Sequence, residues 1–243
     1  FTRSFGDVRP DEGWAFAEDG SGDIRFTGGL PGDQDLGAGA FGGGSGTQVF
    51  QARFDADGTD LGGWSTAQAE GSSALGQALI YDAAGNAYIA GVSWESQNLI
   101  GEAYDTQGNP DAFLLSVAPD GSVRWVNRWG QRDLDAAYGL AIGPAGNIWV
   151  VGEFQNIVDF GGGPVFATPG GSDVYVAAFD PMGGHVFSMA LGGEDSDIAY
   201  DIAAAPDGSM VVVGAHGDQA DLGNGPLDGY GPFLVKLCAD CAG

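Results

Sequence analysis

The chain has 243 residues, 45 of them glycine, and carries a formal net charge of −25. A surface this acidic repels phosphate, which excludes nucleic acid as a partner. No run of about 18 apolar residues occurs, so the sequence predicts no membrane-spanning segment. Abundant glycine with few lysines and glutamates also argues against long helices.

The acidity comes mainly from aspartate, which supplies 26 of the 33 acidic residues. Aspartate favours turns, because its short side chain hydrogen-bonds to nearby backbone. Turn signals flanked by apolar residues recur at Asp19-Gly20, Asp57-Gly58, Asp120-Gly121, Asp207-Gly208 and Ala145-Gly146-Asn147. They predict hairpins. Calcium ligation or adaptation to high salt would explain the remaining acidity. Residues 55–60 resemble a calcium loop, but the glycine and the final glutamate of that motif are misplaced, so we favour a turn there.

A strand pattern that follows a glycine and ends in one recurs four times at intervals of about 62 residues. Its copies are residues 23–29, 86–92, 147–153 and 209–215. A second pattern recurs at 49–54, 112–117, 174–179 and 232–237, and a third at 64–69, 125–130 and 187–192. With a leading strand such as 139–142, each repeat has four strands, joined between the second and third by a glycine-rich stretch such as 159–164. Such repeats are typical of propeller blades.

The third pattern has a stray copy at the N-terminus, where residues 1–6 match residues 187–192. The sequence after the fourth copy of the second pattern lacks this last strand. Pairing residues 1–6 with the last blade would cover an otherwise open sheet edge. We therefore expect an all-β, four-bladed β-propeller in a single domain, with blades of about 7–69, 70–130, 131–193 and 194–243 plus 1–6.

The motifs of residues 135–192 resemble the bacterial β-propeller repeats called SBBP repeats. The similarity rests on Asp135, Tyr138-Gly139-Leu140-Ala141-Ile142, Gly146 to Phe154, Val158 to Pro164, Gly171 to Asp180 and Gly184 to Gly192. It extends over all four units, with the first two more divergent. The resemblance implies a propeller in an extracytoplasmic setting (secreted, cell-surface or periplasmic) and carries no catalytic residues. Proteins with such repeats usually have more than four units. This ring is therefore small, or chains associate, or the sequence is a piece of a longer protein.

The two cysteines, Cys238 and Cys241, are spaced Cys-Ala-Asp-Cys near the end of the last blade. A redox role would need a helix N-terminus in a thioredoxin-like fold. A metal site would need two more ligands, and the two histidines lie at unrelated positions of the repeat. In an exported protein we expect a short disulfide.

Two sets of residues recur at fixed positions of the repeat, one within the leading strand and one just before it. In a propeller this strand lines the central channel, with the preceding loop at its mouth. The candidate ligand-binding residues are Asp11, Asp135 and Asp197, with Trp14, Gln77, Tyr138 and Tyr200. Gathered carboxylates favour a bound cation, so Asp135 and Asp197 are calcium candidates. Aromatic rings beside acids also suit sugars or a cationic side chain. Alternatively, the aspartates cap turns and the aromatics pack between blades. We expect a further set of aromatics to pack between blades: Phe1, Trp64, Trp125, Phe187, Phe50, Phe113, Tyr175 and Phe233.

No motif for catalysis or phosphate binding occurs. We therefore expect a non-enzymatic binding scaffold without a cofactor, calcium excepted, whose loops hold a protein or glycan partner. Two alternatives stay open. One is a structural subunit that assembles into a larger complex or filament. The other is a calcium-dependent enzyme that uses the axial carboxylates.

Overall fold

The structure is a computed structural model. It describes residues 2, 11–18, 20–32, 34–35, 40–41, 46–66, 73–94, 97–98, 103–104 and 110–238. Within these residues every regular element is a β-strand, so the expected all-β class is confirmed. The same residues contain no helix that could cross a membrane. Two compact units divide the chain: Phe1–Gly108 with Leu114–Val126, and Asn109–Phe113 with Asn127–Gly243.

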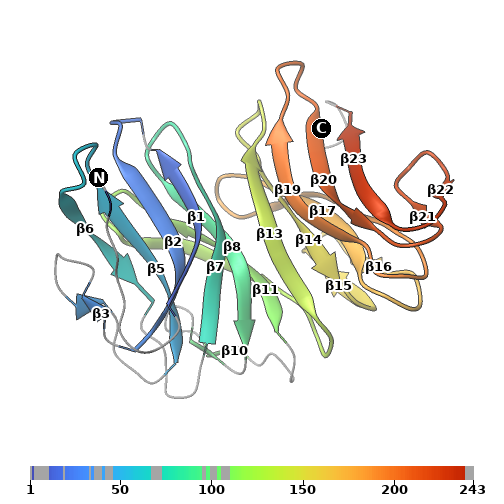
Figure 1. The fold of residues 1–243 in the computed structure, drawn as a ribbon, viewed down its shortest axis with the longest axis horizontal. Helices are drawn as coiled ribbons and strands as arrows, with labels where there is room; N and C mark the ends of the chain where they lie inside the picture. Colours follow the sequence, from blue (N-terminus) through green and yellow to red (C-terminus); the bar gives the residue numbers. More distant parts are fainter. Residues whose placement is uncertain are drawn as a thin grey trace. The chain divides into compact units, whose positions relative to one another are not determined.

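The chain forms four antiparallel sheets one after another, each from a contiguous stretch of the sequence (Figure 1). The first sheet has the order β1 (Glu12–Glu18), β2 (Ile24–Pro31), β5 (Thr47–Phe54), β6 (Asp60–Ser65). The second has the order β7 (Ser73–Tyr81), β8 (Ala87–Trp94), β11 (Asp111–Val117), β12 (Val123–Trp129). The third has the order β13 (Asp135–Ile142), β14 (Ile148–Phe154), β17 (Asp173–Phe179), β18 (His185–Leu191). The fourth has three strands among the described residues: β19 (Ile198–Ala204), β20 (Met210–His216), β23 (Gly231–Leu237).

Short two-stranded ribbons lie in the glycine-rich connections between the second and third strands. They are β3 (Gln34–Asp35) with β4 (Ala40–Phe41), β9 (Gln97–Asn98) with β10 (Ala103–Tyr104), β15 (Ile157–Asp159) with β16 (Pro164–Phe166), and β21 (Ala220–Asp221) with β22 (Pro226–Leu227). The sequence predicted these connections as loops, so the ribbons are additional structure.

The repeat predicted the second and third strands of every sheet to within about two residues at each end. The last strand of the first sheet differs: the sequence pattern placed it at 64–69, whereas β6 spans Asp60–Ser65. The turn before β6 closes with a hydrogen bond from the Asp55 amide to the Thr59 carbonyl, at 3.0 Å, as the equivalent turns before the last strands of the next two sheets do. The strand starts earlier relative to the pattern because two more residues separate this turn from Trp64 than separate the other turns from Trp125 and Phe187. The expected closing strand, residues 1–6, lies outside the described residues except for Thr2.

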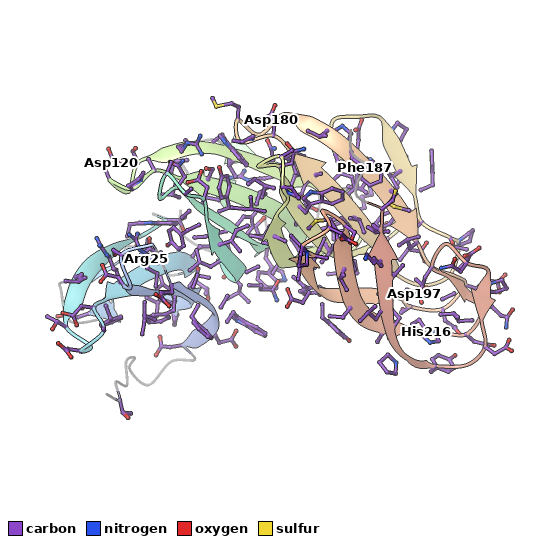
Figure 2. All side chains as sticks on the ribbon, turned by 90° about the horizontal axis from the view of Figure 1, so that it is seen from above. Arg25, Asp120, Asp180, Phe187, Asp197 and His216 are labelled. Atoms are coloured by element: carbon purple, nitrogen blue, oxygen red, sulfur yellow. The ribbon has the colours of Figure 1, made fainter. Side chains whose placement is uncertain are left out.

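The predicted hairpin turns are confirmed wherever the structure describes them. In one of them, the Gly121 amide donates to the Ala118 carbonyl at 2.9 Å, and Gly121 has a φ of +86°. Only glycine adopts this conformation without strain. The Asp120 carboxylate accepts the Ser122 amide at 3.0 Å, and Asp120 lies at the tip of its hairpin (Figure 2). Much of the acidity therefore serves turns.

The core of the second unit consists of apolar side chains from neighbouring sheets. Residues of the third sheet such as Val151 and Val176, both 0% exposed, belong to one cluster with Ile202 and Val212 of the fourth sheet. The Trp129 and Phe179 rings stack with centroids 4.8 Å apart. In the first unit, the Phe26 and Phe50 rings meet edge-on at 5.1 Å. Of the aromatics expected to pack between blades, the third-strand residues Phe50, Phe113, Tyr175 and Phe233 are buried. The last-strand residues Trp64, Trp125 and Phe187 are only partly buried.

Candidate functional site

A β-bulge occupies the same place in the leading strand of all four sheets. The register of each leading strand against the second strand shifts by one residue at four places: between Gly13 and Ala15, Gly76 and Ala78, Ala137 and Gly139, and Ala199 and Asp201. The extra residues are Trp14, Gln77, Tyr138 and Tyr200. These are the candidate residues that the repeat phase selected, and a bulge re-aims the side chain of its extra residue.

The repeated glycine at the end of the second strand lies opposite each bulge. Gly152, for instance, pairs with Ala137. A Cβ at Gly152 would lie 1.8 Å from the Ala136 carbonyl oxygen, and a Cβ at Gly214 would lie 2.0 Å from the Ile198 carbonyl oxygen. Because no side chain fits there, this glycine is the residue that the bulge requires.

In the second unit, two of the candidate aromatics meet. Strands β13 and β19 are neighbours (Figure 1), and the Tyr138 and Tyr200 ring centroids lie 6.4 Å apart. The Tyr138 hydroxyl donates to Glu153 Oε1 at 2.7 Å, and burial together with this carboxylate raises the pKa of Tyr138. Glu153 is 6% exposed, whereas Tyr200 is 53% exposed. This tyrosine pair therefore combines an accessible aromatic face with a buried acid behind it.

In the first unit, the leading strands β1 and β7 are also neighbours. Trp14 is 52% exposed, and its indole N–H donates to Glu12 Oε2 at 2.9 Å. Gln77 is partly buried, and its side-chain carbonyl has no hydrogen-bond partner within the described residues. Asp11, just before β1, is partly buried.

The candidate carboxylates Asp135 and Asp197 are 1% and 0% exposed, and each lies beside a second aspartate. A Cβ at Gly130 would lie 2.3 Å from Asp111 Oδ1 and 2.7 Å from Asp135 Oδ2. One repeat later, a Cβ at Gly192 would lie 2.2 Å from Asp173 Oδ1 and 2.8 Å from Asp197 Oδ2. The two carboxylate pairs are thus equivalent, and each depends on a glycine that leaves it room.

Both candidate aspartates bind the loop that precedes their strand. Asp135 Oδ2 accepts the Gln131 amide at 3.3 Å. Asp197 Oδ2 accepts the Gly193 amide at 2.7 Å, and its Oδ1 accepts the Gly217 amide at 2.8 Å, beside His216 (Figure 2). These contacts favour the alternative in which the aspartates hold turns.

The surroundings of the pairs favour protonation. Burial, helped by the neighbouring charge of Asp111, raises the pKa of Asp135 to about 8. Burial likewise raises the pKa of both Asp173 and Asp197. A protonated Asp135 relieves the repulsion within its pair near neutral pH.

Asp111 and Asp173 were not among the candidates. The sequence feature that could have identified them is their repeated position: each is the first residue of the third strand of its sheet, one repeat apart. Their partners lie at the start of the leading strand of the next sheet (Asp135) or directly before it (Asp197), so the pairs become visible only in the folded chain.

The remaining candidates serve local structure. Asp55 Oδ1 accepts the Asp57 and Thr59 amides at 3.0 and 2.7 Å, which agrees with a turn. Cys238 is disulfide-bonded, and Cys241 lies outside the described residues. Across the described ranges, no group of three or more histidine, cysteine, aspartate or glutamate side chains is arranged to hold a metal ion.

A cavity of about 200 Å³ in the first unit brings two guanidinium groups together. Arg25 and Arg53 lie opposite each other on β2 and β5, and both line the cavity. Arg53 forms an ion pair with Asp23, and the Arg25 guanidinium lies 4.8 Å from the centre of the Tyr81 ring. These neighbours compensate two like charges that would otherwise repel.

No protein-family model matches the sequence, and no curated protein matches it.

Proposed function

We propose that the protein is an exported, non-enzymatic β-propeller scaffold of the SBBP type that binds a protein or glycan partner. The four sheets are its blades, and residues 1–6 form the last strand of the fourth blade. The observation that carries the binding function is the pair Tyr138 and Tyr200. Each is the extra residue of a β-bulge, and their ring centroids lie 6.4 Å apart on adjacent leading strands.

Ring closure is supported by the exposed face of the fourth sheet. Val213 and Leu234 are paired across β20 and β23 and are 38% and 69% exposed. Their counterparts in the third sheet, Val151 and Val176, are paired in the same way and are both 0% exposed. A face that the repeat buries elsewhere is thus uncovered here. A ring in which every sheet packs against the next would bury it.

The open edge of the fourth sheet supports the placement of residues 1–6. Within the described residues β23 pairs only with β20, whereas β17 of the third sheet pairs with both β14 and β18. Residues 1–6 resemble residues 187–192, which are the last five residues of β18 and the glycine that follows them. Pairing them with β23 would satisfy the backbone groups of this edge.

An extracytoplasmic location is supported by the disulfide bond of Cys238, because disulfides persist mainly in oxidising compartments. Binding is supported by the tyrosine pair, where an exposed aromatic face lies close to the Glu153 carboxylate. Sugars and cationic side chains both bind such a combination.

The binding function is tested with immobilised oligosaccharides and basic peptides as probes. We expect saturable binding to one probe class, weakened at least tenfold by Tyr200→Ala. The control is Phe166→Ala, which removes another exposed ring, on the ribbon strand β16 and not on a leading strand. Saturable binding to neither class, or equal binding by the Tyr200→Ala variant, would exclude this site.

The second candidate is a structural subunit that associates with copies of itself. The exposed Val213 and Leu234 face and the edge of β23 favour it, because both suit a neighbouring chain. Sedimentation measurements separate the two proposals. A protein that stays monomeric at high concentration supports the scaffold. An oligomer that forms with increasing concentration, and that the Leu234→Arg substitution dissociates, supports the structural subunit.

A further inference from the structure

The cavity of about 200 Å³ in the first unit lies where the next two sheets have an aromatic ring. The turns before the last strands of the first three sheets span residues 55–59, 118–122 and 180–184, and each closes with the same backbone hydrogen bond. Three residues beyond these turns stand Gly62, Trp125 and Phe187. Gly62 lines the cavity, and a Cβ at Gly62 would meet nothing within 4 Å. The first sheet therefore leaves open a space that the next two sheets fill with a ring.

The ring at this position packs on an aromatic residue of the second strand. The Trp125 and Tyr88 ring centroids lie 5.9 Å apart in the second sheet, and those of Phe187 and Trp149 lie 5.8 Å apart in the third. Each second-strand residue is the third residue of its repeated pattern, and in the first sheet this residue is Arg25 (Figure 2). A guanidinium group beside an open space thus replaces a pair of rings. This arrangement suits a ligand that carries both a ring and a negative charge.

A second guanidinium group faces the same space. Arg53, which pairs with Arg25 across β2 and β5, occupies the position of Ser116 in the second sheet. There, Arg124 Nη1 donates to the Ser116 hydroxyl at 2.8 Å and to the Tyr88 hydroxyl at 3.2 Å. The two positions that supply neutral acceptors in the second sheet therefore both carry a cation in the first. Like charges directly opposite each other in a sheet are destabilising, so a bound anion would stabilise this pair.

Neighbouring groups position both arginines and leave them accessible. Arg53 Nε donates to Asp23 Oδ2 at 2.8 Å, yet the Arg53 side chain is 36% exposed. Arg25 is partly buried, and its guanidinium lies 4.8 Å from the centre of the Tyr81 ring. A guanidinium group that stacks on a ring directs its N–H groups to the sides, where a carboxylate accepts two of them at once. The site is thus arranged before a ligand binds.

The rest of the cavity wall suits a sugar ring. It is mostly polar and includes the Trp64 ring, the buried Gln51 and the hairpin turn 118–121. Aromatic rings pack against sugar rings, and amide groups bind hydroxyls. Drug-sized ligands occupy clefts of about 300–1,000 Å³, so this smaller cavity fits a single sugar residue.

We propose that the cavity binds an acidic sugar residue, whose carboxylate accepts hydrogen bonds from Arg25 and Arg53 and whose ring packs against Trp64. The site belongs to the first unit, and the tyrosine pair belongs to the second. Each can therefore fail its test without the other, and Tyr200→Ala should leave this binding unchanged.

The test is an NMR titration of the full chain with sodium glucuronate in about 0.15 M NaCl, which screens non-specific attraction. The Trp64 indole N–H resonance, identified by its loss in Trp64→Phe, reports on the cavity. We expect a saturable shift of this resonance with glucuronate and none with glucose. Arg25→Gln and Arg53→Gln should each weaken binding by about tenfold or more, the usual effect of losing a hydrogen bond to a charged group.

Two further variants serve as controls. Arg132→Gln removes the same charge from an exposed bend of the second unit and should leave the affinity unchanged. Arg53→Lys keeps the positive charge beside Asp23 but loses the planar fork of the guanidinium group. It should therefore keep the fold and still weaken binding, which tests the site even if Arg53→Gln unfolds.

Four results would overturn the proposal. The first is a Trp64 resonance that glucuronate does not shift saturably. The second is an equal shift with glucose, which would exclude recognition of the carboxylate. The third is tighter binding of benzoate than of glucuronate, which would assign the cavity to aromatic acids. The fourth is an equal loss of affinity in Arg132→Gln, which would assign the binding to overall charge.

Discussion

The Cβ that an alanine would add at Gly152 would lie 1.8 Å from the carbonyl oxygen of Ala136, on the strand across from it. The bulge at Tyr138 brings this carbonyl so close, and the bulge recurs in every sheet. A single steric relationship thus links the repeated glycine of the sequence to the repeated outward side chain of the leading strand.

Gly152→Ala is therefore expected to destabilise the protein by about 1–3 kcal/mol, the usual cost of overpacking in a dense interior. The backbone must move, because the atom that blocks the methyl group is a main-chain oxygen. Urea denaturation measures the change. Gly20→Ala is the control, since a Cβ at Gly20 meets nothing within 4 Å. Equal stability of the two variants would contradict the steric role of Gly152.

Asp135→Asn is expected to change how stability depends on pH. Burial and Asp111 raise the folded-state pKa of Asp135 to about 8, above its unfolded value of 3.8. Its contribution to stability is thus full below about pH 4 and declines as the pH rises toward 8, by about 1.4 kcal/mol per pH unit. Asparagine cannot ionise, so the variant lacks this decline.

Chemical denaturation between pH 4 and pH 8 measures the difference between the wild type and Asp135→Asn. The variant should gain relative stability as the pH rises. An identical pH dependence in both proteins would show that Asp135 is ionised in the folded state throughout this range.

Tyr138→Phe removes the hydroxyl that donates to Glu153 Oε1 at 2.7 Å and leaves a carboxylate of 6% exposure without this donor. A hydrogen bond to a charged group contributes about 1.5–3 kcal/mol, so we expect a loss of stability in this range. Tyr200→Phe, on a ring that is 53% exposed, should change stability by less than about 0.5 kcal/mol. Thermal unfolding compares the two variants, and equal effects would contradict the role of the Tyr138 hydroxyl.

The sequence predicted the strand pattern well, because the strands recur with the same glycines, turns and apolar residues. It also selected Tyr138 and Tyr200 by their phase. It could not show that these residues are bulged, since a bulge exists only relative to a paired strand. Asp111 and Asp173 escaped notice for a similar reason: in sequence each merely precedes a strand, and only folding brings it beside Asp135 or Asp197.

The ribbons in the glycine-rich connections were equally hidden. Asp221, for example, reads as a turn residue, and its carboxylate does accept the amides of its own turn. Its second role, in the wall of a cavity that Asp173 also lines, arises because its main chain pairs with Gly192, which is far from it in sequence. Contacts of this kind follow from how sheets and loops pack, and the local pattern of residues does not encode them.

The central structural proposal is that residues 1–6 pair with β23. Amide hydrogen exchange of β23 (Gly231–Leu237) measures this directly, in the full chain and in a chain that lacks residues 1–6. Our account predicts that the β23 amides not bonded to β20 are protected in the full chain and lose protection in the truncated one. Equal exchange of these amides in both chains would contradict it.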